Sequence, residues 1–367
     1  MTPLLLAALL VATVPETEDP PAPIELRPFL YVQGDAHWVV GGDRADDVRD
    51  AFEVRRLRLG GEARWRRLRA ELDVDPLGGE QWLKDAYLEL RPGRRLRLRG
   101  GWQKLPTLAG REVGAARLDF VERSIAADRL APARDVGLSF RARAGRGELL
   151  VGAFAGDGYR ERHRAGWTLA GRLELEPLRS LVLGGVVTSA DVPDSVAPKG
   201  RDVEGPSGLE LFPDRAVLGR RLRVGADAAW GGPGVRLSAE ILRLAEDSPP
   251  SPLAAGARVV SLAWSGEARW RRGGGKDDGR GAFLPRKQGA FGLGVRVEGA
   301  RQRDPAQASR PTAQAFTGGC GWRPRSFLLV MVNLVHERLE SGPANRRSRT
   351  TGFARLQLEA PMRKEAP

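Results

Sequence analysis

Arginine recurs at every second position in several short stretches of this chain, and this spacing is its clearest chemical signal. The best example is Arg95-Leu96-Arg97-Leu98-Arg99. Successive side chains of a β-strand point to opposite faces, so the three guanidinium groups would lie on one face, each step about 6.6 Å along the strand. A planar guanidinium can bind two oxygens of an oxyanion at once. Such a row along a water-filled passage would favour the movement of small anions.

Four stretches with this spacing are expected to present arginines to the same face of a sheet. These pore-lining residues are Arg56, Arg58, Arg95, Arg97, Arg99, Arg141, Arg143, Arg221 and Arg223. Carboxylates occur on the same predicted face, among them Glu71, Asp73 and Glu89. Two interpretations therefore stay open: the arginines pair with carboxylates on neighbouring strands and only line the wall, or an unpaired row gives anion selectivity.

The elements that would position these arginines are β-strands, because apolar and polar residues alternate along most of the chain. Strands of about ten residues separated by turn residues are typical of a transmembrane β-barrel. We predict an all-β, antiparallel transmembrane barrel of sixteen strands. They are expected near 28–41, 52–61, 64–75, 82–90, 95–102, 136–144, 148–155, 167–176, 180–189, 220–229, 234–244, 258–270, 289–301, 314–321, 326–337 and 351–360.

Connection lengths and tryptophans favour a membrane barrel over a soluble sheet. Short turns alternate with longer connections, as periplasmic turns alternate with outer loops. Tryptophans fall near predicted strand ends, as in the aromatic girdles of such barrels. These are Trp38, Trp65, Trp82, Trp102, Trp167, Trp230 and Trp264. One connection fits poorly: 271–288 is long but falls on the periplasmic side, so either the count is wrong by a hairpin or this segment folds into the lumen.

The N-terminus and the composition narrow the class further. The apolar run Leu4–Val14 is too short to span a membrane and resembles a secretory signal, so we expect a signal peptide and linker at 1–20 and one barrel domain at 21–367. The net charge of +13 is spread along the chain, which argues against a nucleic-acid binder. One cysteine and three histidines, without a nucleophile or metal motif, predict no enzyme, no metal and no cofactor.

Several motifs, in order, resemble the phosphate-selective porin O and P family of outer-membrane channels. They are Arg55-Arg56-Leu57-Arg58-Leu59-Gly60, Leu83-Lys84-Asp85-Ala86-Tyr87-Leu88-Glu89, Gly101-Trp102-Gln103-Lys104-Leu105-Pro106, Phe120-Val121-Glu122-Arg123-Ser124, Arg134-Asp135-Val136-Gly137 and Phe154-Ala155-Gly156-Asp157-Gly158. The good matches cover about 50–175. The chain departs from the pattern in two ways: it has few lysines, and it lacks a terminal phenylalanine on the last strand.

The resemblance implies a homotrimeric porin of the bacterial outer membrane whose third outer loop, here about 104–135, folds inward as a constriction. Its expected charged residues are Lys104, Arg111, Glu122 and Arg123. We therefore expect a water-filled channel for small solutes that favours anions such as phosphate, with membrane lipid as its other partner. The alternative is a closed or plugged barrel with a structural or surface-binding role, which would pass no current.

Overall fold

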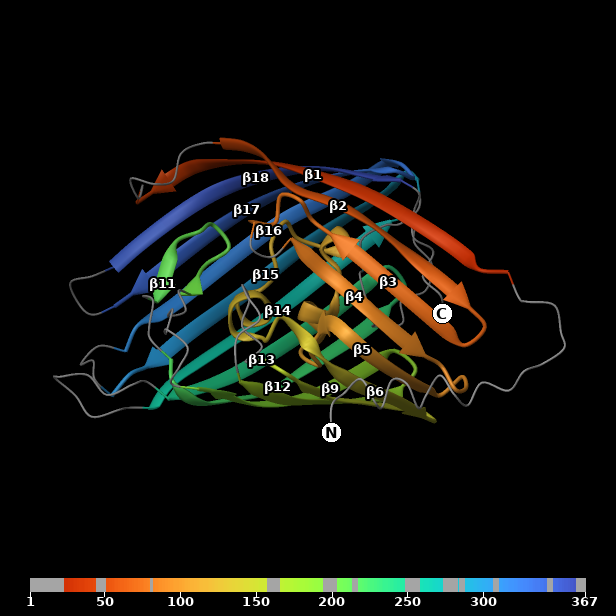
Figure 1. Ribbon diagram of the computed structural model, residues 1–367. Coiled ribbons are helices and arrows are strands. Elements are labelled where there is room, and N and C mark those ends of the chain that lie inside the picture. The colour runs from red at the N-terminus through yellow and green to blue at the C-terminus, as the bar shows by residue number, and fades with distance from the viewer. Residues whose placement is uncertain are drawn as a thin grey trace, which may run out of the picture.

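The chain forms a closed antiparallel β-barrel of sixteen strands (Figure 1). This computed structural model describes residues 23–43, 51–79, 82–156, 166–193, 203–212, 217–247, 258–272, 283, 288–305, 310–341 and 346–360. The barrel strands are β1 (Glu25–Gly42), β2 (Ala51–Trp65), β3 (Leu68–Val74), β4 (Leu83–Leu90), β5 (Leu96–Lys104), β6 (Arg134–Ala144), β7 (Gly147–Phe154), β8 (Trp167–Leu178), β9 (Leu181–Val192), β12 (Gly219–Gly232), β13 (Val235–Asp247), β14 (Arg258–Arg272), β15 (Ala290–Arg303), β16 (Thr312–Arg325), β17 (Leu328–Glu340) and β18 (Arg346–Ala360). The predicted signal peptide lies outside the described residues.

Each barrel strand pairs with its neighbours along the barrel, and β1 pairs with β18 to close the ring. The sixteen predicted strands match the sixteen observed ones in order, so the predicted fold class is confirmed. The segment 273–289 joins β14 to β15 at the same end as the short turns, because Arg272 pairs with Phe291. Both termini of the barrel also lie at that end, since Glu25 pairs with Arg64 beside the β2–β3 turn.

The outer surface of the barrel is apolar because alternate side chains of every strand point away from the lumen. On β5, Leu96 and Leu98 are about 40% exposed. Tryptophans such as Trp38 and Trp230 are exposed near strand ends. No helix in the described ranges is long and apolar enough to cross a membrane. A closed barrel with this exterior belongs in the bacterial outer membrane, with its short turns on the periplasmic side.

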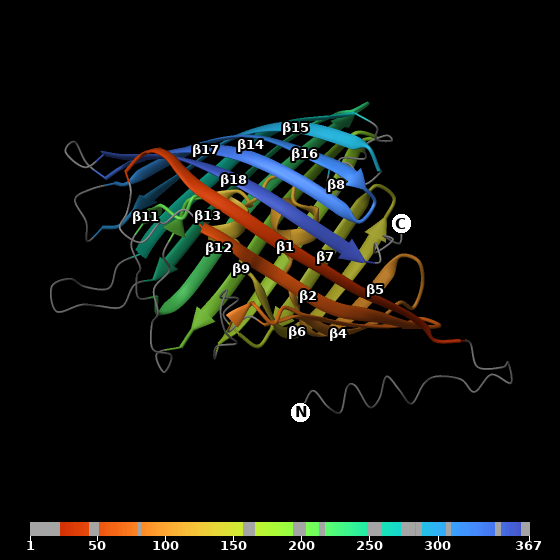
Figure 2. The same cartoon turned by 90° about the horizontal axis from the view of Figure 1, so that it is seen from above.

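Two segments lie inside the ring of strands (Figure 2). The first is the connection between β5 and β6, residues 105–133, which we call the inner loop; it carries the short helices α2 (Ala109–Glu112), η2 (Ala115–Arg117) and η3 (Ala126–Leu130). The second is the hairpin of β10 (Val203–Glu204) and β11 (Glu210–Phe212), within the connection from β9 to β12. The sequence led us to expect the first insertion only.

The inner loop and the β10–β11 hairpin pack on one another and on one side of the inner wall. Their shared apolar cluster joins Ile125 and Leu130 of the loop to Phe212 of the hairpin and to Leu242 and Leu244 of β13, all at most 3% exposed. An ion pair between Arg129 and Glu204 adds a polar link at 2.8 Å. Cavities remain in the lumen beside the inner loop.

Candidate functional site: the lumen beside the inner loop

Buried polar side chains of the barrel wall fix the inner loop in place. Glu298 of β15 accepts a hydrogen bond from the Ile125 backbone N–H at 2.6 Å, and Asn333 of β17 accepts one from Val121 at 2.6 Å. Arg223 of β12 donates to the Leu130 carbonyl at 2.8 Å. These groups satisfy backbone atoms of the loop that would otherwise be buried without partners. The loop is therefore held firmly against the inner wall of the barrel.

Three cavities surround the inner loop. The largest, about 750 Å³, is lined mainly by β1–β6 and the loop, with single residues of β7 and β16–β18, and we call it the basic cavity. A second, about 340 Å³, lies against β6–β15 and is called the balanced cavity. The third, about 430 Å³, lies toward the long loops between the inner loop and the hairpin and is called the outer cavity. Arg123 lines all three, so it marks the point at which they meet.

The cavities differ in their charge. The basic cavity is lined by fourteen lysine and arginine side chains and eight carboxylates. The balanced cavity has eight of each, and the outer cavity has three arginines and four carboxylates. A solute that moves from the outer cavity toward the short turns therefore meets excess positive charge only on the β1–β6 side.

Many of the predicted pore-lining arginines pair with carboxylates on neighbouring strands. Arg58 forms a two-pronged pair with Asp73, and Arg99 binds Glu89 at 2.7 Å. Arg141 and Arg143 share Glu148, each at 2.9 Å. These groups line the lumen, but their charge is partly neutralised, as one of the two interpretations left open above requires.

Three cations beside the inner loop have no carboxylate within 4.0 Å among the described residues. Arg56 donates to the Gln33 side chain at 2.8 Å, Lys104 to the carbonyls of Arg111 and Glu112, and Arg123 to the Val113 carbonyl at 2.7 Å. For the two arginines, these carbonyl and amide oxygens leave the positive charge in place. Burial lowers the pKa of Arg123 to about 10, so this guanidinium stays charged near neutral pH.

A β-bulge in β2 brings two consecutive arginines, Arg55 and Arg56, toward the inner loop. Gln33 pairs with Arg56 while Gly34 pairs with Val54, which leaves Arg55 as the extra residue. A bulge of this kind lets two consecutive side chains point to one face. Arg56 reaches the basic cavity, and Arg55 binds Glu122 of the inner loop at 2.8 Å. Simple alternation assigned Arg55 to the outer face, so the sequence did not identify it.

Other predicted site residues are placed as follows. Arg97 lies on the lumen side of β5 and has no hydrogen bond or ion pair with any described residue. Arg95 is exposed and lies in the turn of residues 92–95, just before β5 begins at Leu96. In the inner loop, Arg111 pairs with Asp128 at 3.1 Å.

Arg221 and Arg223 are corrections to the expected anion path. Both side chains are fully buried, at 1% exposed. Arg221 pairs with Glu246 at 2.7 Å, and Arg223 holds the inner loop. Neither side chain can contact a passing ion. The alternation correctly gave their direction but contained no information on what packs against them.

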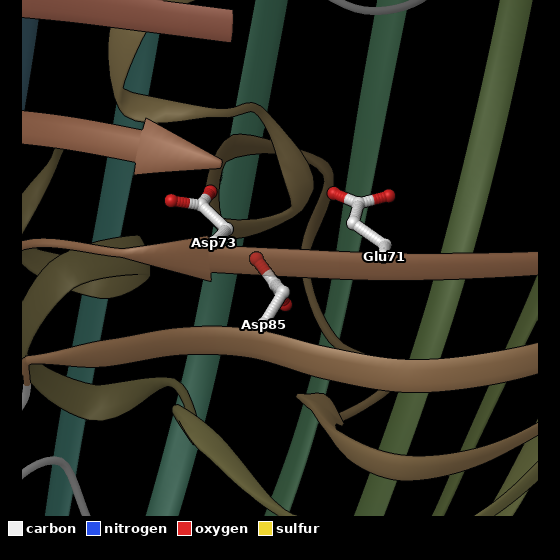
Figure 3. Close-up of side chains that lie close together, drawn as sticks. All are labelled: Glu71, Asp73 and Asp85. Atoms are coloured by element: carbon white, nitrogen blue, oxygen red, sulfur yellow. The ribbon is translucent and has the colours of Figure 1, made fainter. Parts of the chain in front are cut away.

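Three carboxylates, Glu71 and Asp73 of β3 and Asp85 of β4, lie close together on the wall of the basic cavity (Figure 3). Their oxygens are engaged by protein donors: Tyr87 and Arg69 bind Glu71, Arg58 binds Asp73, and Arg134 binds Asp85. Arginines thus provide the positive charge that a metal ion would otherwise supply. The three carboxylates therefore balance the charge of the neighbouring wall arginines, and we do not assign a metal site to them.

The fold and lumen define a transmembrane barrel of the porin type. The structure is similar to in-vitro folded OmpT, an outer membrane protein of Vibrio cholerae, with a TM-score of 0.64 and 9% identity over 92% of this chain and 97% of that one. The structure is also similar to the outer membrane channel DcaP of Acinetobacter baumannii, with a TM-score of 0.61 and 11% identity over 92% of this chain and 97% of that one. A third similar structure is an anion-selective porin from Comamonas acidovorans, with a TM-score of 0.58 and 13% identity over 92% of this chain and 100% of that one. No protein-family model and no curated protein matches the sequence.

Proposed function

We propose that this protein is an outer-membrane porin that forms a water-filled channel and favours small anions, phosphate among them. The observation that carries the proposal is the basic cavity, where fourteen basic side chains face eight carboxylates. Arg56 and Arg123 keep their charge beside the inner loop, and Arg123 also lines the outer cavity. A fixed excess of positive charge along a pore attracts anions and repels cations. No catalytic group is needed for this role.

The preference for phosphate rests on the arginine chemistry and on the motif resemblance to phosphate-selective porins. Guanidinium groups suit oxyanions because each presents a planar fork of donors. Arg56 and Arg123 belong to the quoted motifs and line the same cavity. Among the similar structures, one is an anion-selective porin, and one is a trimer form of OmpT. Both support an anion-favouring homotrimer in membrane lipid.

A plugged barrel is the second candidate, because the inner loop and the β10–β11 hairpin share a buried apolar cluster within the lumen. Conductance of the refolded protein in a planar lipid bilayer separates the two. The porin proposal predicts stable single-channel currents in KCl, and replacement of chloride by phosphate should leave a measurable anion current. A barrel that inserts but passes no current in either salt would establish the plugged candidate.

A further inference from the structure

The short-turn end of β4–β7 carries an unbalanced group of arginines, which we call the inner rim. Its five arginines are Arg91, Arg97, Arg99, Arg141 and Arg143, and its two carboxylates are Glu89 and Glu148. Glu89 is bound by Arg91 at 2.6 Å and by Arg99 at 2.7 Å. Glu148 is shared by Arg141 and Arg143. Both carboxylates are thus already engaged twice.

Arg97 and Arg141 stand directly opposite each other on β5 and β6. Their side chains point to the same lumen, and like charges in directly opposed positions of an antiparallel pair are unfavourable. Arg97 is half-buried and has no hydrogen bond or ion pair with the described part of the chain. A guanidinium that forms no direct pair with a described carboxylate, beside a second arginine, is a position at which a bound anion would lower the energy of the protein itself.

The inner rim also borders both of the cavities that flank the inner loop on the short-turn side. Arg97 lines the basic cavity, and Arg141 lines both the basic and the balanced cavity. The basic and balanced cavities therefore adjoin at Arg141, with Arg97 on the basic side.

We propose that Arg97 and Arg141 form an oxyanion-binding station at the periplasmic exit of the channel. This inference rests on the proposed function and adds a second, separate site to the cations beside the inner loop. Two opposed guanidinium forks suit a doubly charged tetrahedral oxyanion, inorganic phosphate or sulfate. Such an ion has several oxygens that accept hydrogen bonds at once, whereas chloride is a single atom. Occupancy of the station removes the repulsion between the two arginines.

The test measures the phosphate concentration that halves the chloride current through single channels. Arg97→Gln should raise this concentration about tenfold, because charge-assisted hydrogen bonds are lost at the station. Arg97→Lys keeps the charge without the fork and should fall between the two. The matched control is Arg146→Gln, in the exposed β6–β7 turn, where Arg146 donates to the Pro177 carbonyl at 3.1 Å. This control removes the same charge from the same end outside both cavities and should leave the block unchanged.

Thermal unfolding of the refolded barrel gives a second readout that a purely structural arginine would not produce. Without phosphate, Arg97→Gln should be at least as stable as the parent protein, because one of two opposed like charges is gone. Added phosphate should raise the melting temperature of the parent more than that of the variant, since a ligand stabilises the folded state that binds it. An anion-selective parent whose phosphate block is the same in Arg97→Gln would overturn the station alone. A cation-selective parent would instead overturn the proposed function.

Discussion

Among single substitutions that remove a positive charge outside the barrel strands, Arg123→Gln should reduce anion preference most. Arg123 lines all three cavities and lacks a carboxylate partner among the described residues. Its charge acts on an ion about 5 Å away with about 1 kcal/mol in a water-like medium and about 3 kcal/mol at an effective dielectric constant of 20. The lower value alone corresponds to roughly a fivefold change in ion occupancy.

The assay is the anion-to-cation permeability ratio of Arg123→Gln, obtained from the zero-current potential in a KCl gradient. We expect the ratio to fall about fivefold or more, with the larger effect at low ionic strength because salt screens the charge. Glutamine can still donate to the Val113 carbonyl, so the inner loop should keep its position and the conductance should change little.

Arg64→Gln is the matched control, because Arg64 also lines the basic cavity but is paired with Glu62. Glu62 keeps Arg69 as a partner at 2.6 Å, so the control leaves no isolated buried carboxylate. Equal losses of selectivity in both variants would refute the reasoning, because the position at the junction would then have no special effect.

Three further predictions follow from particular contacts. Anion preference should decline as the pH rises from about 8 to about 11, because Arg123, whose pKa is lowered to about 10, loses its charge over that range. Zero-current potentials of the parent and of Arg123→Gln test this prediction. An equal decline in both proteins would exclude Arg123 as the titrating group. Arg355→Met should lower the free energy of unfolding by about 3–5 kcal/mol, because it leaves Asp35 buried without the two-pronged pair at 2.6 and 2.7 Å. In denaturant unfolding, the added substitution Asp35→Asn should restore part of this stability. If it restored none, the pairing argument would be contradicted. Glu337→Leu should raise single-channel conductance, since Glu337 accepts hydrogen bonds from the backbone and side chain of Ser207 in the hairpin; an unchanged conductance would mean that the hairpin stays docked without them.

The barrel itself could be predicted from sequence because its main determinant is local. Alternation of apolar and polar residues assigns each strand an outer and an inner face, and turn residues mark the strand ends. All sixteen strands follow from this rule, as does the inward direction of Arg58, Arg97 and Arg141. Local patterns also located the inner loop, once the motifs around Lys104 and Phe120 were compared with a known family.

Features that depend on contacts distant in sequence could not be predicted in the same way. The burial of Arg223 depends on the inner loop, whose Leu130 carbonyl it binds from far away in the sequence. The bulge at Arg55 depends on the register of β1 against β2, which alternation within one strand does not contain. The hairpin 203–212 has strands of two and three residues, too short to produce a periodic signal.

The insertion of that hairpin becomes understandable from its contacts. Gly205 lies so close to Glu337 that an added Cβ would overlap the carboxylate. The sequence shows only a glycine in a long connection, and its meaning appears when the partner strand is known. Likewise, Phe283, in the connection from β14 to β15, is 2% exposed and donates its backbone N–H to Asp119 of the inner loop at 3.0 Å. That contact agrees with the alternative in which this connection reaches the lumen.

The zero-current potential of the parent protein across a KCl gradient tests the central claim most directly. A channel in which the basic cavity sets selectivity should give a potential displaced toward the chloride equilibrium potential. Phosphate in place of chloride should keep the same sign. A potential displaced toward the potassium equilibrium potential would contradict the account, because the excess of arginine and lysine on the β1–β6 side would then not control which ions pass.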